Sequence, residues 1–338
     1  MYYLEELTVN KMIVHILDPS LSVPILSMEE MSGSTDAQDF FASHIIKTMN
    51  DDALKTCSFD ETYNMFLVYL KEYLQNEEQF VLFSTNIASQ LFDIMSVNQV
   101  IPAGDLAIVG FHYNGIAYIA ILKMNYQNTY IHYTDFENEV HINNIIQHKT
   151  TLPNINQRIS EAMIINLSTL DVGILEKSYE IEGSKENYLS KRFLKCKTKL
   201  SSKQQYGIVK KATDEIAKKY FDENIEKKMA IKKELFESIE ETGSINLTKF
   251  ANEIFQTQED VKEAFMENME KQGLTEPTIQ LQEKTISRSF DKQRIKTDQG
   301  IEIKIPMALY NDPNSVEFIN HPDGKISIVI KNIGKIIG

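Results

Sequence analysis

Lysine side chains gather in one short stretch of this chain, and their ammonium groups can contact phosphate groups. Residues 185–219 hold eleven Lys and Arg residues against three Asp and Glu residues, although the whole chain carries a net charge of −13. Such a surplus can neutralise the backbone of a nucleic acid. The candidate contacts are Lys191, Arg192, Lys195, Lys197, Lys199, Lys203, Tyr206, Lys210, Lys211, Lys218 and Lys219, here called the basic segment.

The pattern around these lysines predicts a helix–loop–helix junction. A loop and the N-terminus of a following helix both present donors to phosphates, and the interleaved aromatic residues could stack on bases. The alternative is a solvated lysine face on an amphipathic helix, which also produces this composition. Nothing in the segment specifies a base sequence, so any nucleic-acid binding would have little sequence preference.

A second candidate lies near the C-terminal end. Asp298, Glu302 and Lys304 follow the order of the metal-binding carboxylates and lysine of restriction-type nucleases. Glu302 and Lys304 would share one face of a strand. The run Ile-Glu-Ile-Lys-Ile also arises from simple alternation between core and solvent, which is the more common origin of such a pattern.

Other reactive residues lack the spacing that chemistry requires. The histidines do not pair at the intervals of metal ligands, and Cys57 and Cys196 have no CxxC motif, so we expect inert thiols in a reducing compartment. Phosphate-binding loops and a serine nucleophile elbow are absent from the sequence. The sequence therefore predicts no catalytic residues, no metal and no cofactor. The histidines are His15, His44, His112, His132, His141, His148 and His321.

Composition is that of an ordinary globular protein, with 42% hydrophobic and 25% charged residues. No apolar run reaches the length of about 18 residues needed to cross a membrane, and the N-terminal residues do not resemble a secretory signal. We therefore expect a cytoplasmic protein without a membrane partner.

The elements that must position these residues centre on Asn114-Gly115. This dipeptide suits the two left-handed positions of a type I′ turn, and apolar runs on both sides predict a hairpin of residues 105–113 and 116–126. The second strand is apolar almost throughout, so it should be central and buried on both faces. Further strands are expected over 8–17, 22–26, 129–136 (continuing the meander), 158–167 and 171–177. Helices are expected over 34–48, capped by Ser34 or Thr35, over 61–74, and over 84–96, capped by Ser84-Thr85.

The C-terminal half changes character near Gly183. Helices are expected over 188–195, from Ser201 or Ser202 to about Glu241 with one break near 221–224 and an end at Gly243, and over 247–255 and 259–272. Strands return from Thr278 onward. The expected class is α+β: a mixed, mainly antiparallel sheet with flanking helices, a helical middle segment and a short C-terminal β element. We expect an N-terminal domain of residues 1–182 and a C-terminal domain of residues 183–338, helical over about 184–275.

Several segments in order resemble the bacterial 37-kDa nucleoid-associated protein family. They are MIVHILD, VIPAGDLAIVGFHYNGIAYIAILKMNY, Leu152-Pro153, FLKCKTKLSSKQQ and TDQGIEIKIP…NHPDGKISIVIKNI. The resemblance runs from about residue 8 to residue 331. It implies a cytoplasmic protein found with the bacterial nucleoid, and it supplies no catalytic residues.

Three hypotheses follow. The leading one is a non-enzymatic protein that binds DNA, or RNA, through the basic segment. Because an acidic protein is repelled by duplex DNA, the second is an interaction protein recruited to the nucleoid by a protein partner. The third is a metal-dependent nuclease that uses Asp298, Glu302 and Lys304. A homo-oligomer is compatible with all three.

Overall fold

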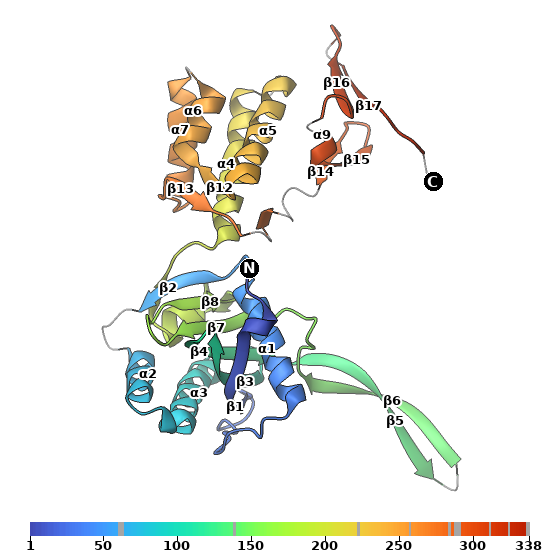
Figure 1. The fold of residues 1–338 in the computed structure, drawn as a ribbon. Helices are drawn as coiled ribbons and strands as arrows, with labels where there is room; N and C mark the ends of the chain where they lie inside the picture. Colours follow the sequence, from blue (N-terminus) through green and yellow to red (C-terminus); the bar gives the residue numbers. More distant parts are fainter. Residues whose placement is uncertain are drawn as a thin grey trace. The chain divides into compact units, whose positions relative to one another are not determined.

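The computed structural model describes residues 1–59, 64–137, 140–221, 224–256, 258–282, 285–286, 292–310, 312–323 and 325–335. The chain divides into two compact units, Met1–Ser201 and Ser202–Gly338 (Figure 1). We had expected a boundary after residue 182. Residues 183–201 belong to the first unit because Tyr188, Leu189 and Phe193 are buried in its core.

The first unit is built on one seven-stranded sheet, and every pairing described in it is antiparallel (Figure 1). The α+β class predicted from the sequence is thus confirmed. The strands, in order across the sheet, are β1 (Leu7–Leu17), β3 (Gly104–Tyr113), β4 (Ile116–Asn125), β7 (Glu161–Asn166), β8 (Val172–Leu175), β2 (Lys55–Phe59) and β11 (Cys196–Thr198). Two shorter strands, β9 (Tyr179–Ile181) and β10 (Ser184–Glu186), form a separate ladder.

The predicted hairpin is confirmed as the centre of this sheet. Asn114 and Gly115 both have positive φ, 49° and 77°, as a type I′ turn requires. Strand β4 lies between β3 and β7, and its residues alternate between two cores. Ile119 and Ile121 pack on one face, whereas Ala120 and Leu122 pack on the other.

Three helices cover the two faces of the sheet. Helix α1 (Thr35–Met49) packs on one face, and α2 (Met65–Gln75) and α3 (Phe80–Val97) pack on the other. Ser34 caps α1 as predicted, by accepting a hydrogen bond from the backbone of Ala37. Asn64 caps α2; the residues 61–63 that the sequence assigned to this helix lie outside the described residues.

The N-terminus predicted for the third helix is wrong. Ser84 and Thr85 were expected to cap it, but α3 begins at Phe80, after a short helical turn η2 (Glu77–Gln79). Their hydroxyls donate back to the carbonyls of Val81 and Leu82, within the helix. The stretch Glu77–Val97 is long and apolar enough to cross a membrane. Half of its most apolar part is buried inside the fold, as in the core helix of a globular protein.

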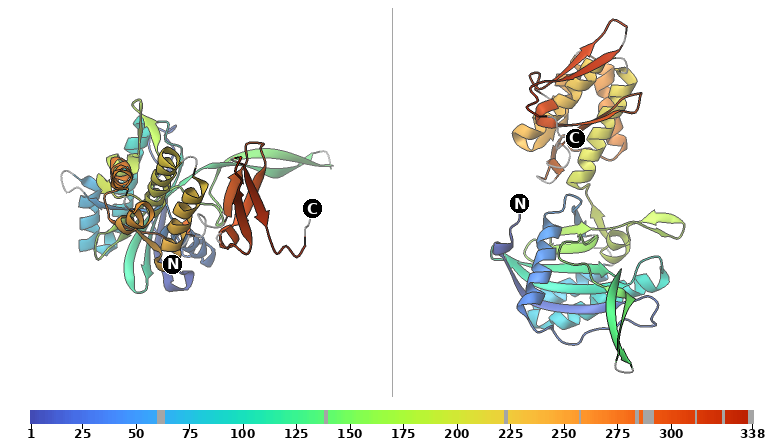
Figure 2. Two further views of the ribbon diagram at one scale, coloured as in Figure 1. Left: turned by 90° about the horizontal axis from the view of Figure 1, so that it is seen from above. Right: turned by 90° about the vertical axis from the view of Figure 1, so that its right-hand side faces the viewer.

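Residues 127–151 do not continue the meander, which corrects the sequence-based prediction. Strand β5 (Gln127–Glu137) pairs with β6 (Val140–Thr151), and these two strands form a ladder of their own. The edge of β4 that β5 would have used is occupied by β7. We call residues 127–151 the arm, because it projects from the body of the first unit in Figure 1 and in the left view of Figure 2.

Two smaller predictions also need correction. Residues 22–26 contribute a single bridge, between Ile25 and Ile16, rather than a strand. The helix expected over 188–195 is one wide turn, η3 (Leu189–Phe193), closed by a bond from the Leu194 N–H to the Leu189 carbonyl, 2.8 Å long.

The second unit is helical first and β-structured at its end, as predicted. Gly243, at φ 66°, ends the second helix in the left-handed conformation that favours glycine. The helices are α4 (Ser202–Tyr220), α5 (Ile225–Thr242), α6 (Leu247–Phe255), α7 (Glu259–Lys271) and α9 (Met307–Tyr310). The strands pair as β12 (Ser244–Asn246) with β13 (Thr278–Gln280), β14 (Lys292–Lys296) with β15 (Glu302–Pro306), and β16 (Val316–Asn320) with β17 (Ile326–Ile330).

Candidate nucleic-acid interface

The basic segment crosses the boundary between the two units. Residues Lys191–Lys199 lie on η3 and around β11 in the first unit, and residues Lys203–Lys219 lie on α4 in the second. The expected helix–loop–helix junction is therefore a turn and an edge strand followed by one helix.

The first part places three exposed lysines at one edge of the sheet: Lys197 lies in β11, and Lys195 and Lys199 flank that strand. Lys195, Lys197 and Lys199 alternate with Cys196 and Thr198, and Cys196 is half-buried against the core. Lys197 and Lys199 share one face of this extended segment, and their Cα atoms are about 6.6 Å apart at the usual rise of a strand. We call Lys195, Lys197 and Lys199 the strand lysines.

The backbone holds this strand at both ends. The Lys199 N–H donates to the Thr56 carbonyl over 2.8 Å, and Lys197 lies opposite Ser58 of β2. Lys195 precedes the strand at φ 45°, in the left-handed region that residues with a Cβ rarely adopt. The ammonium groups therefore project from a fixed backbone rather than from a loop.

Arg192 is already engaged by carboxylates. Its guanidinium pairs with Glu186 through Nε and with Glu182 through a 3.2 Å contact. These hydrogen bonds, that of Glu186 first, raise the pKa of Arg192 above its ordinary value. Lys191 is exposed on the same turn. The predicted contact at Arg192 would thus have to displace an acidic neighbour.

The second part lies on the solvent face of α4. Val209, Ala212 and Ile216 form its buried face, and Tyr206 is also buried, with 8% of its surface exposed. The Tyr206 ring is therefore packed inside the unit and is not presented to a base. The exposed residues predicted from the sequence are Lys203, Lys210, Lys211, Lys218 and Lys219.

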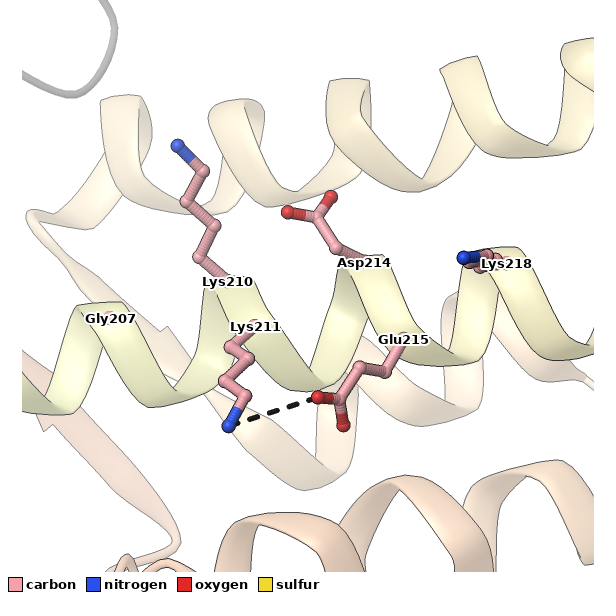
Figure 3. A pocket seen from close by; sticks show the side chains of 6 residues that line it. All are labelled: Gly207, Lys210, Lys211, Asp214, Glu215 and Lys218. Atoms are coloured by element: carbon pink, nitrogen blue, oxygen red, sulfur yellow. Dashed lines mark ion pairs between the residues drawn. The ribbon is translucent and has the colours of Figure 1, made fainter.

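A shallow hollow runs along this face of α4, and its lining mixes both signs of charge (Figure 3). Lys210 and Lys211 point away from one another, and Asp214 and Glu215 lie between them and Lys218 (Figure 3). Lys211 Nζ is 3.8 Å from Glu215, an exposed pair of the kind that contributes about 1 kcal/mol or less. The hollow is lined by Gly207, Lys210, Lys211, Asp214, Glu215 and Lys218.

The nuclease-like residues do not assemble into a metal site. Glu302 and Lys304 do share a face of β15, and the residue opposite Glu302 across the ladder is Lys296. The Asp298 carboxylate accepts the N–H of the next residue in a turn. Among the residues that the structure describes, no group of three or more His, Cys, Asp or Glu side chains could hold a metal ion.

Two of the histidines and both cysteines are packed in the first unit. His15 is fully buried, and burial lowers its pKa to about 4. His44 is within 3.3 Å of the Pro153 carbonyl, and burial lowers its pKa as well. Cys57 and Cys196 lie on adjacent strands, where a hydrogen bond with Cys196, together with burial, raises the pKa of the Cys57 thiol. A raised thiol pKa means low reactivity.

A buried polar cluster in the first unit escaped the sequence analysis. Lys123 and Glu161 have fully buried side chains, with Nζ and Oε2 3.9 Å apart. Glu161 also accepts hydrogen bonds from Asn125 and, over 3.1 Å, from Tyr179. Burial lowers the pKa of Lys123 to about 8, although Glu161 opposes that shift. Two charged residues within otherwise apolar strands were the signal for this cluster.

A comparison with protein families decides the class of the chain. The family model described as nucleoid-associated protein YejK matches residues 13–337. The chain belongs to this nucleoid-associated protein family. A search of curated proteins found no match.

The match spans both units of this nucleoid-associated protein. It includes the β3–β4 hairpin, the strand lysines and α4, so the family likeness extends over the whole candidate interface. The resemblance noted in the sequence is confirmed.

Proposed function

We propose that this nucleoid-associated protein binds DNA directly, with little sequence preference and without catalysis, and that the strand lysines supply the main phosphate contacts. It would act in the cytoplasm, at the nucleoid. The observation that carries the proposal is the exposed row of strand lysines on a fixed edge strand. Phosphate contacts of this kind fix a protein on DNA but carry no sequence information.

The surroundings of two other members of the basic segment weaken the case for phosphate contacts there. Arg192 is paired with two carboxylates, and Lys211 has Glu215 beside it. Within the described part of the chain, Lys197 and Lys199 are exposed and form no ion pair within 4 Å. Acidic surfaces more than a Debye length away, about 10 Å at 0.1 M salt, oppose such a contact only weakly.

The test is the salt dependence of binding to a duplex without a defined sequence. Each neutralised phosphate contributes about 0.9 to the slope of log affinity against log salt. Replacing Lys197 and Lys199 by Gln should lower that slope by about 1.8 and weaken binding about tenfold or more. Two matched double variants serve for comparison: Lys210→Gln with Lys218→Gln on α4, and Lys71→Gln with Lys304→Gln outside the basic segment.

The comparison variants separate the outcomes. If the α4 pair lowers the slope and the strand pair does not, direct binding stands but the strand-lysine assignment is wrong. The same titration with RNA in place of DNA shows which of the two nucleic acids the protein binds more tightly. Incubation of DNA with Mg²⁺ or Mn²⁺ should leave it intact, with Glu302→Ala as the control for a nuclease.

A second candidate function is recruitment by a DNA-bound protein. The net charge of −13 and the neutralised Arg192 favour this version, because both reduce attraction to a polyanion. It predicts that the purified protein has no affinity for DNA at any salt concentration and co-purifies with a nucleoid protein.

A further inference from the structure

Arg192 is the one arginine among the candidate contacts of the basic segment, and two carboxylates hold it. A guanidinium can bind a phosphate through two parallel N–H donors, which a lysine ammonium cannot do. The Arg192 Nε pairs with Glu186, and its Nη2 lies 3.2 Å from Glu182 Oε2. Both donors on this edge of the guanidinium are therefore bound to carboxylates rather than open to a phosphate.

The two carboxylates differ in how firmly they are held. The Glu186 side chain is 16% exposed and belongs to β10, whereas the Glu182 side chain is 76% exposed and stands in the turn between β9 and β10. An ion pair with an exposed partner contributes little to stability, because water solvates the carboxylate almost as well as the guanidinium does. Glu186 therefore orients Arg192, and Glu182 is the carboxylate that can be removed without disturbing the fold.

The backbone at position 182 does not suit a glutamate. Glu182 and Gly183 have φ values of 52° and 79°, which are the two left-handed positions of a type I′ turn. Asparagine, aspartate or glycine adopts the first of these positions at lower cost than a longer side chain with a Cβ. The turn gives no reason for a glutamate here, whereas the contact with Arg192 does.

Arg192 lies next to the strand lysines. It belongs to η3, which packs against β11, and Lys195 follows three residues later. Three residues span at most about 11 Å, so a DNA backbone that contacts Lys195 passes within reach of the Arg192 side chain. Arg192, Glu182 and Glu186 together carry one positive and two negative charges, however, and this net negative group repels phosphates.

We propose that Glu182 makes an autoinhibitory contact: it withholds Arg192 from DNA, and loss of the Glu182 charge turns this arginine into a phosphate contact. The contact keeps the affinity for DNA low without removing the arginine from the interface. This inference rests on the direct DNA binding proposed above. It adds to that function one further contact residue and the group that controls it.

The experiment is a titration of the full chain with a duplex without a defined sequence at several salt concentrations. Glu182→Gln keeps the shape of the side chain but removes its charge. Its slope of log affinity against log salt should be steeper than that of the wild type by about 0.9, because Arg192 neutralises one more phosphate. If both proteins bind equally at 1 M salt, this slope makes the variant bind about eightfold more tightly at 0.1 M.

Two further variants separate release of Arg192 from a general change in charge. Glu180→Gln is the matched control, because it removes one exposed carboxylate from the same hairpin, at a position that lies opposite Lys185 in the ladder. It should leave the slope at the wild-type value. Adding Arg192→Gln to Glu182→Gln should remove the gain. Circular dichroism checks that each variant is folded.

The outcomes distinguish this inference from the proposed function. If the wild type binds DNA and Glu182→Gln has the same slope, direct binding stands and the autoinhibitory contact is wrong. An equal gain in Glu180→Gln, or a gain that persists without Arg192, also overturns it, because either result reports net charge alone. Binding by Glu182→Gln but not by the wild type supports the contact. If neither protein binds the duplex at any salt concentration, the proposed function fails and this inference fails with it.

Discussion

Lowering the pH from 7 to 5 is expected to weaken the first unit by about 2 kcal/mol through His15 alone. The ring is fully buried on β1, and burial lowers its pKa to about 4 from the ordinary 6.5. Its Nδ1 accepts the Ser27 N–H over 3.1 Å, so the proton of the neutral ring sits on Nε2, which has no partner in the described chain. A protonated ring would lose that bond and place an uncompensated charge in the core.

The sign follows from proton uptake. Below pH 6.5 the unfolded chain binds a proton at His15 that the folded chain refuses until about pH 4, so stability falls as the pH decreases through that window. The full shift corresponds to about 3 kcal/mol, of which about 2 kcal/mol is lost between pH 7 and pH 5. His44, whose pKa burial also lowers, adds to the same trend.

Hydrogen exchange of the β1 amides between pH 5 and pH 7, corrected for intrinsic exchange, measures this loss in the first unit alone. In His15→Gln the loss should be smaller by about 2 kcal/mol, whatever the variant does to stability at pH 7. His15→Asn is a second choice if Gln does not fold. His112→Gln, at an exposed histidine of the same unit, is the control and should keep the wild-type dependence. An unchanged pH dependence in both His15 variants would refute the reasoning.

Two further predictions concern packing and are measured by urea denaturation. Gly104→Ala should lower the free energy of unfolding by about 3 kcal/mol, because the new Cβ would lie 2.4 Å from the Met124 carbonyl oxygen. Gly207→Ala should raise the free energy of unfolding by about 0.5–1 kcal/mol, because alanine favours helix α4 and nothing lies within 4 Å of the new atom. A loss at both glycines would contradict this account. Glu161→Leu should lower the free energy of unfolding by about 3–5 kcal/mol, because it leaves the buried charge of Lys123 without its carboxylate. Adding Lys123→Met should recover most of that loss. Equal losses in the single and double variants would show that the two residues are not coupled.

Local signals in the sequence predicted turns and helix ends correctly where the local residues alone determine the backbone conformation. The Asn114-Gly115 turn demands positive φ at two positions, and few dipeptides meet that demand, so the central hairpin was predictable. Ser34 and Gly243 likewise marked helix ends. Ser84 and Thr85 misled because a hydroxyl can satisfy an internal carbonyl as readily as cap a helix, and only the packing of Phe80 and Phe83 in the core decides between the two.

Pairing partners were not predictable, because strand neighbours are chosen by competition across the fold. The sequence between residues 129 and 136 is a good strand, but whether it joins the sheet depends on whether β7 takes the edge of β4 first. The candidate interface shows the same limit. The alternation Lys-Cys-Lys-Thr-Lys over 195–199 has the period of a strand, yet most of it was predicted to be the loop of a helix–loop–helix junction. The carboxylates that neutralise Arg192 come from neighbouring turns and could not be assigned from spacing.

The left-handed backbone at Lys195 means that the positive charge at this position costs the fold some stability. At φ 45° a residue with a Cβ carries a penalty of about 1–2 kcal/mol that glycine does not. Glycine or asparagine at this position would make the fold more stable, but either would remove a cation from the edge strand. A lysine here makes the edge of the sheet less stable than glycine would, and it keeps a positive charge at the start of β11, one of the two edge strands of the described sheet.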